Sequence, residues 1–427
     1  MDGTARKTRL KYAATINDEA LPEDTAPEFE MQYLDIGNVD SDGGIQGIAT
    51  HRFEEAPSRA RRIARNGDVI VSTVRTYLQA IAPIQSPPDN LIVSTGFAVV
   101  RPRRGRLSAE FCKFSLREPS FLAQVEMRSV GVSYPAINSS DLGDISIYLP
   151  TIERQDCIAA FLNTEVRRID QLLIVKQLLL ELLAEKRRAL ITHAVTRGLD
   201  PNAPLRDSGL PWLGHIPAHW KTAPLRFVAS FLGGATPDKG NAEYWQGSIP
   251  WVSPKDMKRD EIGDAEDHVS EDALQDSVLQ LIPIGSVLIV VRGMILAHSF
   301  PAAITTELVT INQDMKALRC AALLDPRFLQ VVLQGLTRAL IALTGESAHG
   351  TKKLDTDVLG KFDIPLPSRV EQSAIIAHVK CGIAKLDALT TATQGTITLL
   401  KERRAALIAA AVTGQLVFQE PTRTRTA

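Results

Sequence analysis

The chain has 427 residues, of which 44% are hydrophobic and 23% charged, and its formal net charge is -1. This balance is typical of a soluble protein with two or more folded domains, and it excludes both an intrinsically disordered chain and a globally basic one. Apolar runs such as 287–291 are far shorter than the roughly 18 residues that a membrane span needs. The charged first residues contain no apolar stretch, so we expect no secretory signal, no membrane segment and a cytoplasmic location.

A variable region, residues 1–150, comes first along the chain. Its segment 50–106 contains ten Lys and Arg against four Asp and Glu, a net charge of +6. Two explanations fit this clustering equally: a face for nucleic acid, or a solvated surface with its own counterions. The β-branched strings at 66–75 and 90–101 each predict a strand entered through a turn, so we expect a mixed α/β fold.

A long helix is predicted next, over 151–198, because neither proline nor glycine interrupts the chain between Pro150 and Gly198. The same unit returns near the other end. Residues 142–196 match residues 359–413 at a constant offset of 217, with 21 identities in 55 positions. Long-period similarity of this kind indicates two copies of one structural unit. The order is therefore variable region, repeat, variable region, repeat.

The repeats contain a heptad pattern, with apolar residues at alternating steps of four and three. Arg187 and Arg404 occupy the same seam position in the two copies. Two such stripes in one chain most simply pack against each other as an intramolecular coiled coil. The apolar seam residues are Leu162, Val166, Ile169, Leu173, Leu180, Leu183 and Leu190 in the first copy, and Val379, Ile383, Leu386, Ile397, Leu400 and Leu407 in the second.

Two further features distinguish the repeats. The second copy contains Gly382 and Gly395, each costing roughly 1 kcal/mol relative to alanine within a helix, so we expect a weaker or locally broken helix there. The first copy carries a second apolar stripe outside the seam. Either a partner protein or this chain's own domains could cover this second stripe, and we give the two explanations equal weight. The stripe consists of Leu172, Val175, Leu179 and Leu182.

The segment 199–367 is interpreted as a linker followed by a second variable region. Its strings at 284–293 and 308–319 are similar to 66–75 and 90–101, which predicts one scaffold with different loops in the two regions. We expect a second long helix over 368–415 and a tail over 416–427.

Enzyme signatures are missing from the sequence. The string SPPD at 86–89 lacks the residues of an adenine methyltransferase motif, and Gly233-Gly234 is not followed by a phosphate-binding lysine. Asp238, Asp256 and Lys258 imitate a metal-dependent nuclease, but we attribute this short pattern to chance. The four cysteines are scattered, which fits neither disulfides nor a zinc site. We expect no catalytic residue, metal or cofactor on this chain.

With this organisation, the chain resembles the specificity subunits of type I restriction-modification systems across nearly its whole length. The strings that carry the resemblance are SGLPWLGHIPAHW (208–220), ATPDKGNAEYWQGSIPWVSPKDM (235–257), IYLPTIERQDCIAAFL (147–162), IPLPSRVEQSAIIAHV (364–379), EKRRALITHAVTRG (185–198) and KERRAALIAAAVTGQL (401–416).

The resemblance implies two mixed α/β target recognition domains, joined by two long antiparallel coiled-coil helices with pseudo-two-fold symmetry. Each domain would read one half of a bipartite, asymmetric site in double-stranded DNA, and the helices would set the spacer. Two methyltransferase subunits would dock on the chain and modify adenine, and translocating restriction subunits could join them. S-adenosylmethionine, ATP and Mg²⁺ would then belong to the partners.

Base-reading residues are expected on loops of the recognition domains, because Arg, Asn and Gln can pair with base edges there. A structural role for any single one of them is about twice as frequent. Two rival classes remain, a coiled-coil scaffold without DNA and a transcriptional regulator without methyltransferases. The candidates are Arg75, Tyr77, Ser133 and Tyr134 in the first domain, and Arg292, His298, Asn312, Gln313, Lys352 and Lys353 in the second.

Overall fold

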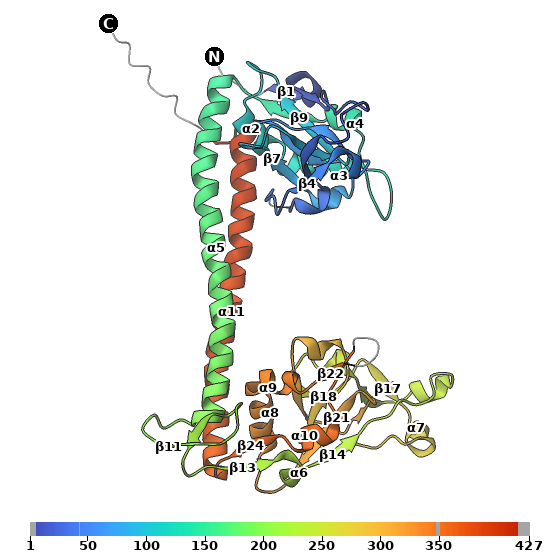
Figure 1. Cartoon of the computed structure of the whole chain (residues 1–427), viewed down its shortest axis with the longest axis vertical. Helices are drawn as coiled ribbons and strands as arrows, with labels where there is room; N and C mark the ends of the chain where they lie inside the picture. The colour runs from blue at the N-terminus through green and yellow to red at the C-terminus, as the bar shows by residue number, and fades with distance from the viewer. Residues whose placement is uncertain (1–5, 42, 347–350, 417–427) are drawn as a thin grey trace. The chain divides into compact units, whose positions relative to one another are not determined.

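A computed structural model describes residues 6–41, 43–346 and 351–416. The chain forms two compact units, which are Met1–Gln177 with Gln394–Ala427 (unit 1) and Leu178–Thr393 (unit 2). The boundary between the units crosses both long helices. Each unit therefore contains one α/β region and one half of each helix (Figure 1).

Unit 1 is built on two four-stranded sheets, ordered β2-β9-β6-β7 and β4-β3-β8-β5. The string 90–101 forms two strands instead of one, because a turn interrupts it at residues 95 and 96. The strands are β1 (Arg6–Arg9), β2 (Ala14–Ile16), β3 (Glu30–Leu34), β4 (Ala49–Arg52), β5 (Ala60–Ile63), β6 (Val69–Ser72), β7 (Ile81–Pro83), β8 (Leu91–Ser94), β9 (Phe97–Pro102) and β10 (Ser146–Leu149), and the short helices are α1 (Leu10–Ala13), α2 (Ala109–Ser115), α3 (Pro119–Met127) and α4 (Ser139–Gly143).

Unit 2 is built on a five-stranded sheet, β14-β21-β18-β19-β16, and a three-stranded sheet, β17-β15-β20. The buried helix α8 packs on the larger sheet. The strands are β11 (Leu205–Asp207), β12 (His215–Pro217), β13 (Lys221–Pro224), β14 (Ala229–Gly233), β15 (Ile249–Val252), β16 (Glu261–Ile262), β17 (Asp267–Val269), β18 (Val287–Val290), β19 (Ala302–Thr305), β20 (Thr310–Ile311), β21 (Met315–Cys320), β22 (Gly345–Glu346), β23 (Lys352–Lys353) and β24 (Asp363–Leu366), and the short helices are α6 (Leu225–Val228), α7 (Glu271–Asp276), α8 (Pro326–Gly335), α9 (Thr337–Ala342) and α10 (Thr356–Gly360).

The two long helices are α5 (Ile152–Arg197) and α11 (Arg369–Val412). They run antiparallel and side by side within each unit (Figure 1). All the predicted seam residues are buried or half-buried, so the predicted helix pairing is confirmed. Among the described residues, no helix combines the length and apolarity needed to cross a membrane.

The expected weakening of the second helix is wrong, because α11 is continuous over 44 residues. Gly382 has a packing reason: a Cβ atom there would lie 2.5 Å from Cδ2 of Leu190 on α5. The missing side chain thus makes room for a seam leucine, and this packing offsets the low helix propensity of glycine. Nothing in the structure explains Gly395, because a Cβ atom there would meet open space.

The repeat also duplicates the polar contacts that hold helix to domain. Gln155 and Gln372, at equivalent positions, are both fully buried. Gln155 donates to the carbonyl oxygens of Arg106 and Pro150 and accepts from the backbone N–H of Ser108. Gln372 makes the matching set of contacts with Leu323, Pro367 and Asp325. One buried amide therefore ties each long helix to the domain that precedes it.

A second duplicated contact joins the two helices. Asp170 forms an ion pair with Arg404 in unit 1, with 3.0 Å between Oδ1 and Nε, and Asp387 pairs with Arg187 in unit 2. Each arginine occupies the seam position predicted from the heptads. The seam cations are therefore paired across the coiled coil by the aspartates that the repeat conserves between its copies.

Candidate nucleic-acid interface

The first candidate surface lies on the turn that follows β6 in unit 1. Arg75 adopts a left-handed backbone conformation, with φ at 52°, and begins the 3-10 turn Thr76–Leu78. Its guanidinium lies over the ring of Tyr134 at 4.9 Å. The hydroxyl oxygens of Thr76 and Ser129 are 2.7 Å apart, which joins the turn to the loop 128–137. Three predicted residues, Arg75, Tyr77 and Tyr134, thus belong to one local surface.

This surface is rich in exposed apolar groups that the sequence analysis did not single out. Tyr77 and Tyr134 are 52% and 65% exposed, and Ser133 is exposed between Tyr134 and a fully exposed Val132. Exposed apolar clusters of this kind commonly mark an interaction site. The additional exposed residues are Leu78, Met127, Val130 and Val132.

The second candidate surface occupies the corresponding place after β18 in unit 2. Gly293 has φ at 145° and precedes the 3-10 turn Met294–Ala297. The backbone of Arg292 forms a bridge with that of Lys353, and the N–H of Leu354 donates to the carbonyl of Val291 at 2.8 Å. The same arrangement exists in unit 1, where the N–H of Ile137 donates to the carbonyl of Thr73 at 2.9 Å. Both domains therefore present a turn and a crossing segment at the end of an equivalent strand.

A shallow cavity of about 310 Å³ brings together Arg292, Gln313 and Lys353. Its charge is mixed, because Asp355 and Asp357 lie on its rim and Asp314 lies 3.8 Å from Nη1 of Arg292. Gln313 is exposed, and its amide oxygen accepts from the hydroxyl of Thr236. The cavity offers guanidinium, ammonium and amide donors, which are the groups that read guanine and adenine edges.

The remaining predicted residues of unit 2 differ in their surroundings. Asn312 is buried, and its amide oxygen accepts from the N–H of Asp314, so it shapes the turn that presents Gln313. His298 is exposed at the end of the 3-10 turn, and Lys352 is half-buried in the β22–β23 hairpin. Of these three, Asn312 is therefore the residue least able to reach a base without a local rearrangement.

The basic segment 50–106 is partly neutralised by acids, of which Asp18, Glu19 and Asp35 lie outside it. Arg101 is bound by Asp68, Asp18 and Glu19, and the ion pair with Asp68 holds the pKa of Arg101 well above its usual range despite partial burial. Arg65 pairs with Glu19, and Arg59 with Asp35. The net charge of this segment therefore overstates the positive charge that its surface presents.

The nuclease-like pattern has a structural explanation. Asp256 accepts hydrogen bonds from the N–H and the hydroxyl of Ser253 at 2.8 and 2.9 Å, forming a capping box for a 3-10 turn. Within the part of the chain that the structure describes, no three His, Cys, Asp or Glu side chains are grouped to hold a metal ion. Burial raises the pKa of Cys320 to about 12, so this thiol is a poor nucleophile.

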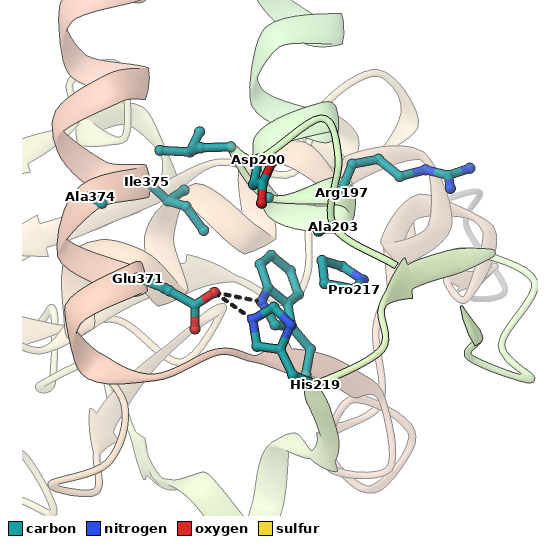
Figure 2. A pocket seen from close by; sticks show the side chains of 11 residues that line it. Arg197, Asp200, Ala203, Pro217, His219, Glu371, Ala374 and Ile375 are labelled. Atoms are coloured by element: carbon teal, nitrogen blue, oxygen red, sulfur yellow. Dashed lines mark hydrogen bonds and ion pairs between the residues drawn. The ribbon is translucent and has the colours of Figure 1, made fainter. Parts of the chain in front are cut away.

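A second cavity, of about 180 Å³, lies in unit 2 where α5 ends and α11 begins. Pro217 of the linker strand β12 and the following His219 and Trp220 line it. Figure 2 shows His219 facing Glu371 of α11. Both rings donate to Oε1 of Glu371, at 2.7 Å from His219 and 3.1 Å from Trp220. His219 therefore ties the linker to the first turn of α11.

We expect this contact to make unit 2 sensitive to acid. Burial would raise the pKa of Glu371, but hydrogen bonds from His219, Trp220 and Ser368 lower it to about 2. A carboxylate with a lowered folded-state pKa stabilises the fold above its unfolded value near 4.5, and this stability is lost as the pH falls from about 4.5 to 2. Glu371→Gln should flatten that part of the profile. Melting temperatures of both proteins from pH 7 to 2 test it, and parallel profiles would contradict it.

Comparison with known proteins relates the second unit to a family. Residues 217–401 match the model of the type I restriction modification DNA specificity domain. This segment is similar to a type I DNA specificity domain. The matched segment contains most of unit 2, including Arg292, Gln313 and Lys353. The resemblance inferred from the sequence is therefore confirmed. The cavity that contains Arg292, Gln313 and Lys353 lies inside the matched segment.

Relatives and solved structures agree with this assignment. The EcoR124I/EcoR124II specificity subunit of Escherichia coli is 34% identical over 172 residues, covering 40% of this chain and 41% of that protein. The chain matches about two fifths of the length of the first curated relatives. A structure described as the basis of "complex assembly and conformational transition of the type I R-M system" has a chain with a TM-score of 0.79 and 25% identity, covering 96% of this chain and 98% of that one.

The fold itself is shared more widely. The HsdS subunit from Thermoanaerobacter tengcongensis aligns with a TM-score of 0.56 and 24% identity, covering 96% of this chain and 97% of that subunit. The predicted combination of mixed α/β regions and two long helices is therefore a known fold for the specificity domain and its surroundings.

Proposed function

We propose that this chain is the DNA specificity subunit of a type I restriction-modification complex. Each α/β region reads one half of a bipartite, asymmetric site in double-stranded DNA, and the chain has no catalytic activity of its own. The observation that carries the proposal is the repeated surface after β6 and β18, of which the second lies in the matched specificity domain.

The side chains on these two surfaces have the chemistry needed to read DNA bases. A guanidinium can donate two hydrogen bonds to guanine, and an amide can pair with adenine, in the major groove. Arg75 is held by the ring of Tyr134, and Arg292 by backbone pairing with Lys353, so both are placed before DNA arrives. The two loops have different sequences on equivalent strands, which allows unequal half-sites on one scaffold.

Partner subunits supply the chemistry in this proposal. Two methyltransferases dock on the duplicated framework and modify adenine, restriction subunits join them, and S-adenosylmethionine, ATP and Mg²⁺ bind to those partners. The second stripe on α5 supports docking, because its leucines and valine are exposed and the chain's own domains do not cover them. Of the two covers that were given equal weight, the chain's own domains leave these side chains exposed. The exposed fractions are 49% for Leu172, 60% for Val175, 37% for Leu179 and 52% for Leu182.

Methylation mapping tests the proposal directly. The full chain is expressed with its methyltransferase, and the methylated motif is determined by sequencing for wild type, Arg75→Ala and Arg292→Ala. Each variant should relax discrimination in a different half of the motif, by about 1–3 kcal/mol at one base pair. The unaltered half should stay fully specified, because the two arginines belong to different domains.

Arg104→Ala is the matched control, since it removes the same charge from an exposed turn in unit 1. Its motif should equal that of wild type. A chain that recruits no methyltransferase would support a regulator or scaffold instead. Relaxation of both halves by either variant alone would show that the two domains do not read independently.

A further inference from the structure

Thr236 contacts the candidate base reader Gln313 through a hydrogen bond, in which its hydroxyl donates to the amide oxygen of Gln313. The two residues come from different segments, since Thr236 follows β14 and Gln313 lies in the turn between β20 and β21. Gln313 lines the cavity together with Arg292 and Lys353, whereas Thr236 does not line it. Thr236 therefore supports a residue of the candidate surface from outside the cavity.

The backbone that carries Thr236 is held by several contacts. The N–H of Ala235 donates to the last carbonyl of β20 at 3.0 Å, and the indole N–H of the buried Trp251 donates to the carbonyl of Ala235 at 2.9 Å. Gly234 allows close approach to the turn, because a Cβ atom there would lie 2.0 Å from the carbonyl oxygen of Asn312. None of these contacts involves the Thr236 hydroxyl, which is therefore held at the turn by the surrounding backbone.

The turn that carries Gln313 is fixed in the same way. The N–H of Asn312 donates to the last carbonyl of β15 at 2.9 Å, and the N–H of Met315 donates to the carbonyl of Asn312 at 3.2 Å. The buried side chain of Asn312 accepts from the N–H of Asp314 at 3.1 Å. Because the backbone is fixed, the freedom that remains at Gln313 is that of its exposed side chain, and the hydroxyl of Thr236 restricts it.

The restrained amide keeps the groups that pair with adenine. An amide oxygen has two lone pairs, and the amide nitrogen has two N–H donors. The Thr236 hydroxyl occupies one lone pair, so the second lone pair and both donors of Gln313 remain available. Adenine presents N7 as an acceptor and N6 as a donor in the major groove, which matches this set. A side chain that is oriented before DNA arrives loses less freedom on binding.

We propose that Thr236 is a positioning residue for base reading, whose hydroxyl orients the amide of Gln313 toward an adenine in the half-site read by unit 2. The proposal rests on the proposed function, because it requires the cavity that Gln313 lines to face DNA. Thr236 touches no base itself and acts through Gln313.

Methylation rates of the full chain with its methyltransferase test this role. The substrates are four duplexes that differ only at the base pair where Gln313→Ala relaxes the motif. Thr236→Val keeps the branched shape and removes the hydroxyl, so discrimination at this base pair should fall about fivefold, as expected for one lost hydrogen bond. Thr236→Ser retains a hydroxyl and should retain the discrimination. The rest of the motif should stay unchanged in both variants.

A double variant separates positioning from a merely structural role. When Gln313 is already alanine, Thr236→Val should reduce discrimination no further, because the amide that the hydroxyl orients is gone. Thr50→Val is the matched control. The Thr50 hydroxyl accepts from the amide of Gln32 at 3.0 Å, a threonine–glutamine pair that belongs to neither candidate surface. The motif of this control should equal that of wild type.

Three results would overturn the proposal. The first is unchanged discrimination in Thr236→Val although Gln313→Ala relaxes the motif, and the second is a further loss in the double variant. The third is an unchanged motif in Gln313→Ala, because Gln313 then reads no base. In that third case Arg292→Ala distinguishes the two hypotheses: a relaxed motif leaves the proposed function in place, and an unchanged motif removes base reading by the cavity altogether.

Discussion

Replacing Gln372 by alanine is expected to lower the free energy of unfolding of unit 2 by about 3–5 kcal/mol, because three buried backbone groups lose their hydrogen-bond partner. The amide of Gln372 serves the carbonyls of Leu323 and Pro367 and the N–H of Asp325. The side chain is fully buried, so water cannot replace these contacts without opening the packing.

Gln155→Ala should have the same effect on unit 1, because its amide makes the equivalent contacts. Hydrogen exchange of the full chain separates the two effects, with faster exchange confined to the unit that carries the change. Gln394→Ala is the control, since Gln394 also belongs to an identical pair of the repeat but is exposed. A loss of less than about 1 kcal/mol in Gln372→Ala would show that the amide is dispensable.

Gly234→Ala is expected to destabilise the specificity domain by about 3 kcal/mol, the upper part of the range for overpacking. A Cβ atom there would lie 2.0 Å from the carbonyl oxygen of Asn312 and 2.3 Å from that of Ile311. Neither backbone oxygen can move freely, because the N–H of Ala235 donates to the Ile311 carbonyl at 3.0 Å and the N–H of Met315 donates to the Asn312 carbonyl at 3.2 Å. Relief of the clash must separate this backbone from the turn that carries Gln313, so methylation specificity in the corresponding half of the motif should be lost.

Gly233→Ala provides a matched control one residue away. Its Cβ atom would meet the tip of the flexible Lys316 side chain at 3.2 Å, which can move at little cost. The two variants should therefore differ clearly, both in their stability to urea and in the methylated motif. Equal stability of the two would show that the sheet beside Gln313 adjusts without loss.

The long helices and their pairing were predictable from the sequence, because local periodicity reports burial directly. A residue every three or four positions, as from Leu162 to Val166 and Ile169, can only line one side of a helix. The constant offset of 217 added that the same unit exists twice. The family resemblance followed from this order, since it rests on strings whose positions are linear along the chain.

The candidate surfaces depended on contacts that no local pattern encodes. The ring of Tyr134 reaches Arg75 across 59 residues of chain, and burial of Asn312 follows from the turn around Gln313. Arginines that looked like a basic face are paired with acids such as Asp18 and Glu19, which lie outside the counted segment. Composition counts charges, whereas the field at a surface depends on which charges are adjacent.

Sequence alone determined the architecture of this protein, namely two variable regions and two long helices with one seam each. Tertiary structure decided which side chains are exposed at the ends of β6 and β18 and why Gly382 is tolerated beside Leu190. The physical reason is the separation along the chain of the residues that determine each feature. Helical periodicity is a property of neighbours in the chain, whereas loops, ion pairs and cavities are formed by residues that only folding brings together.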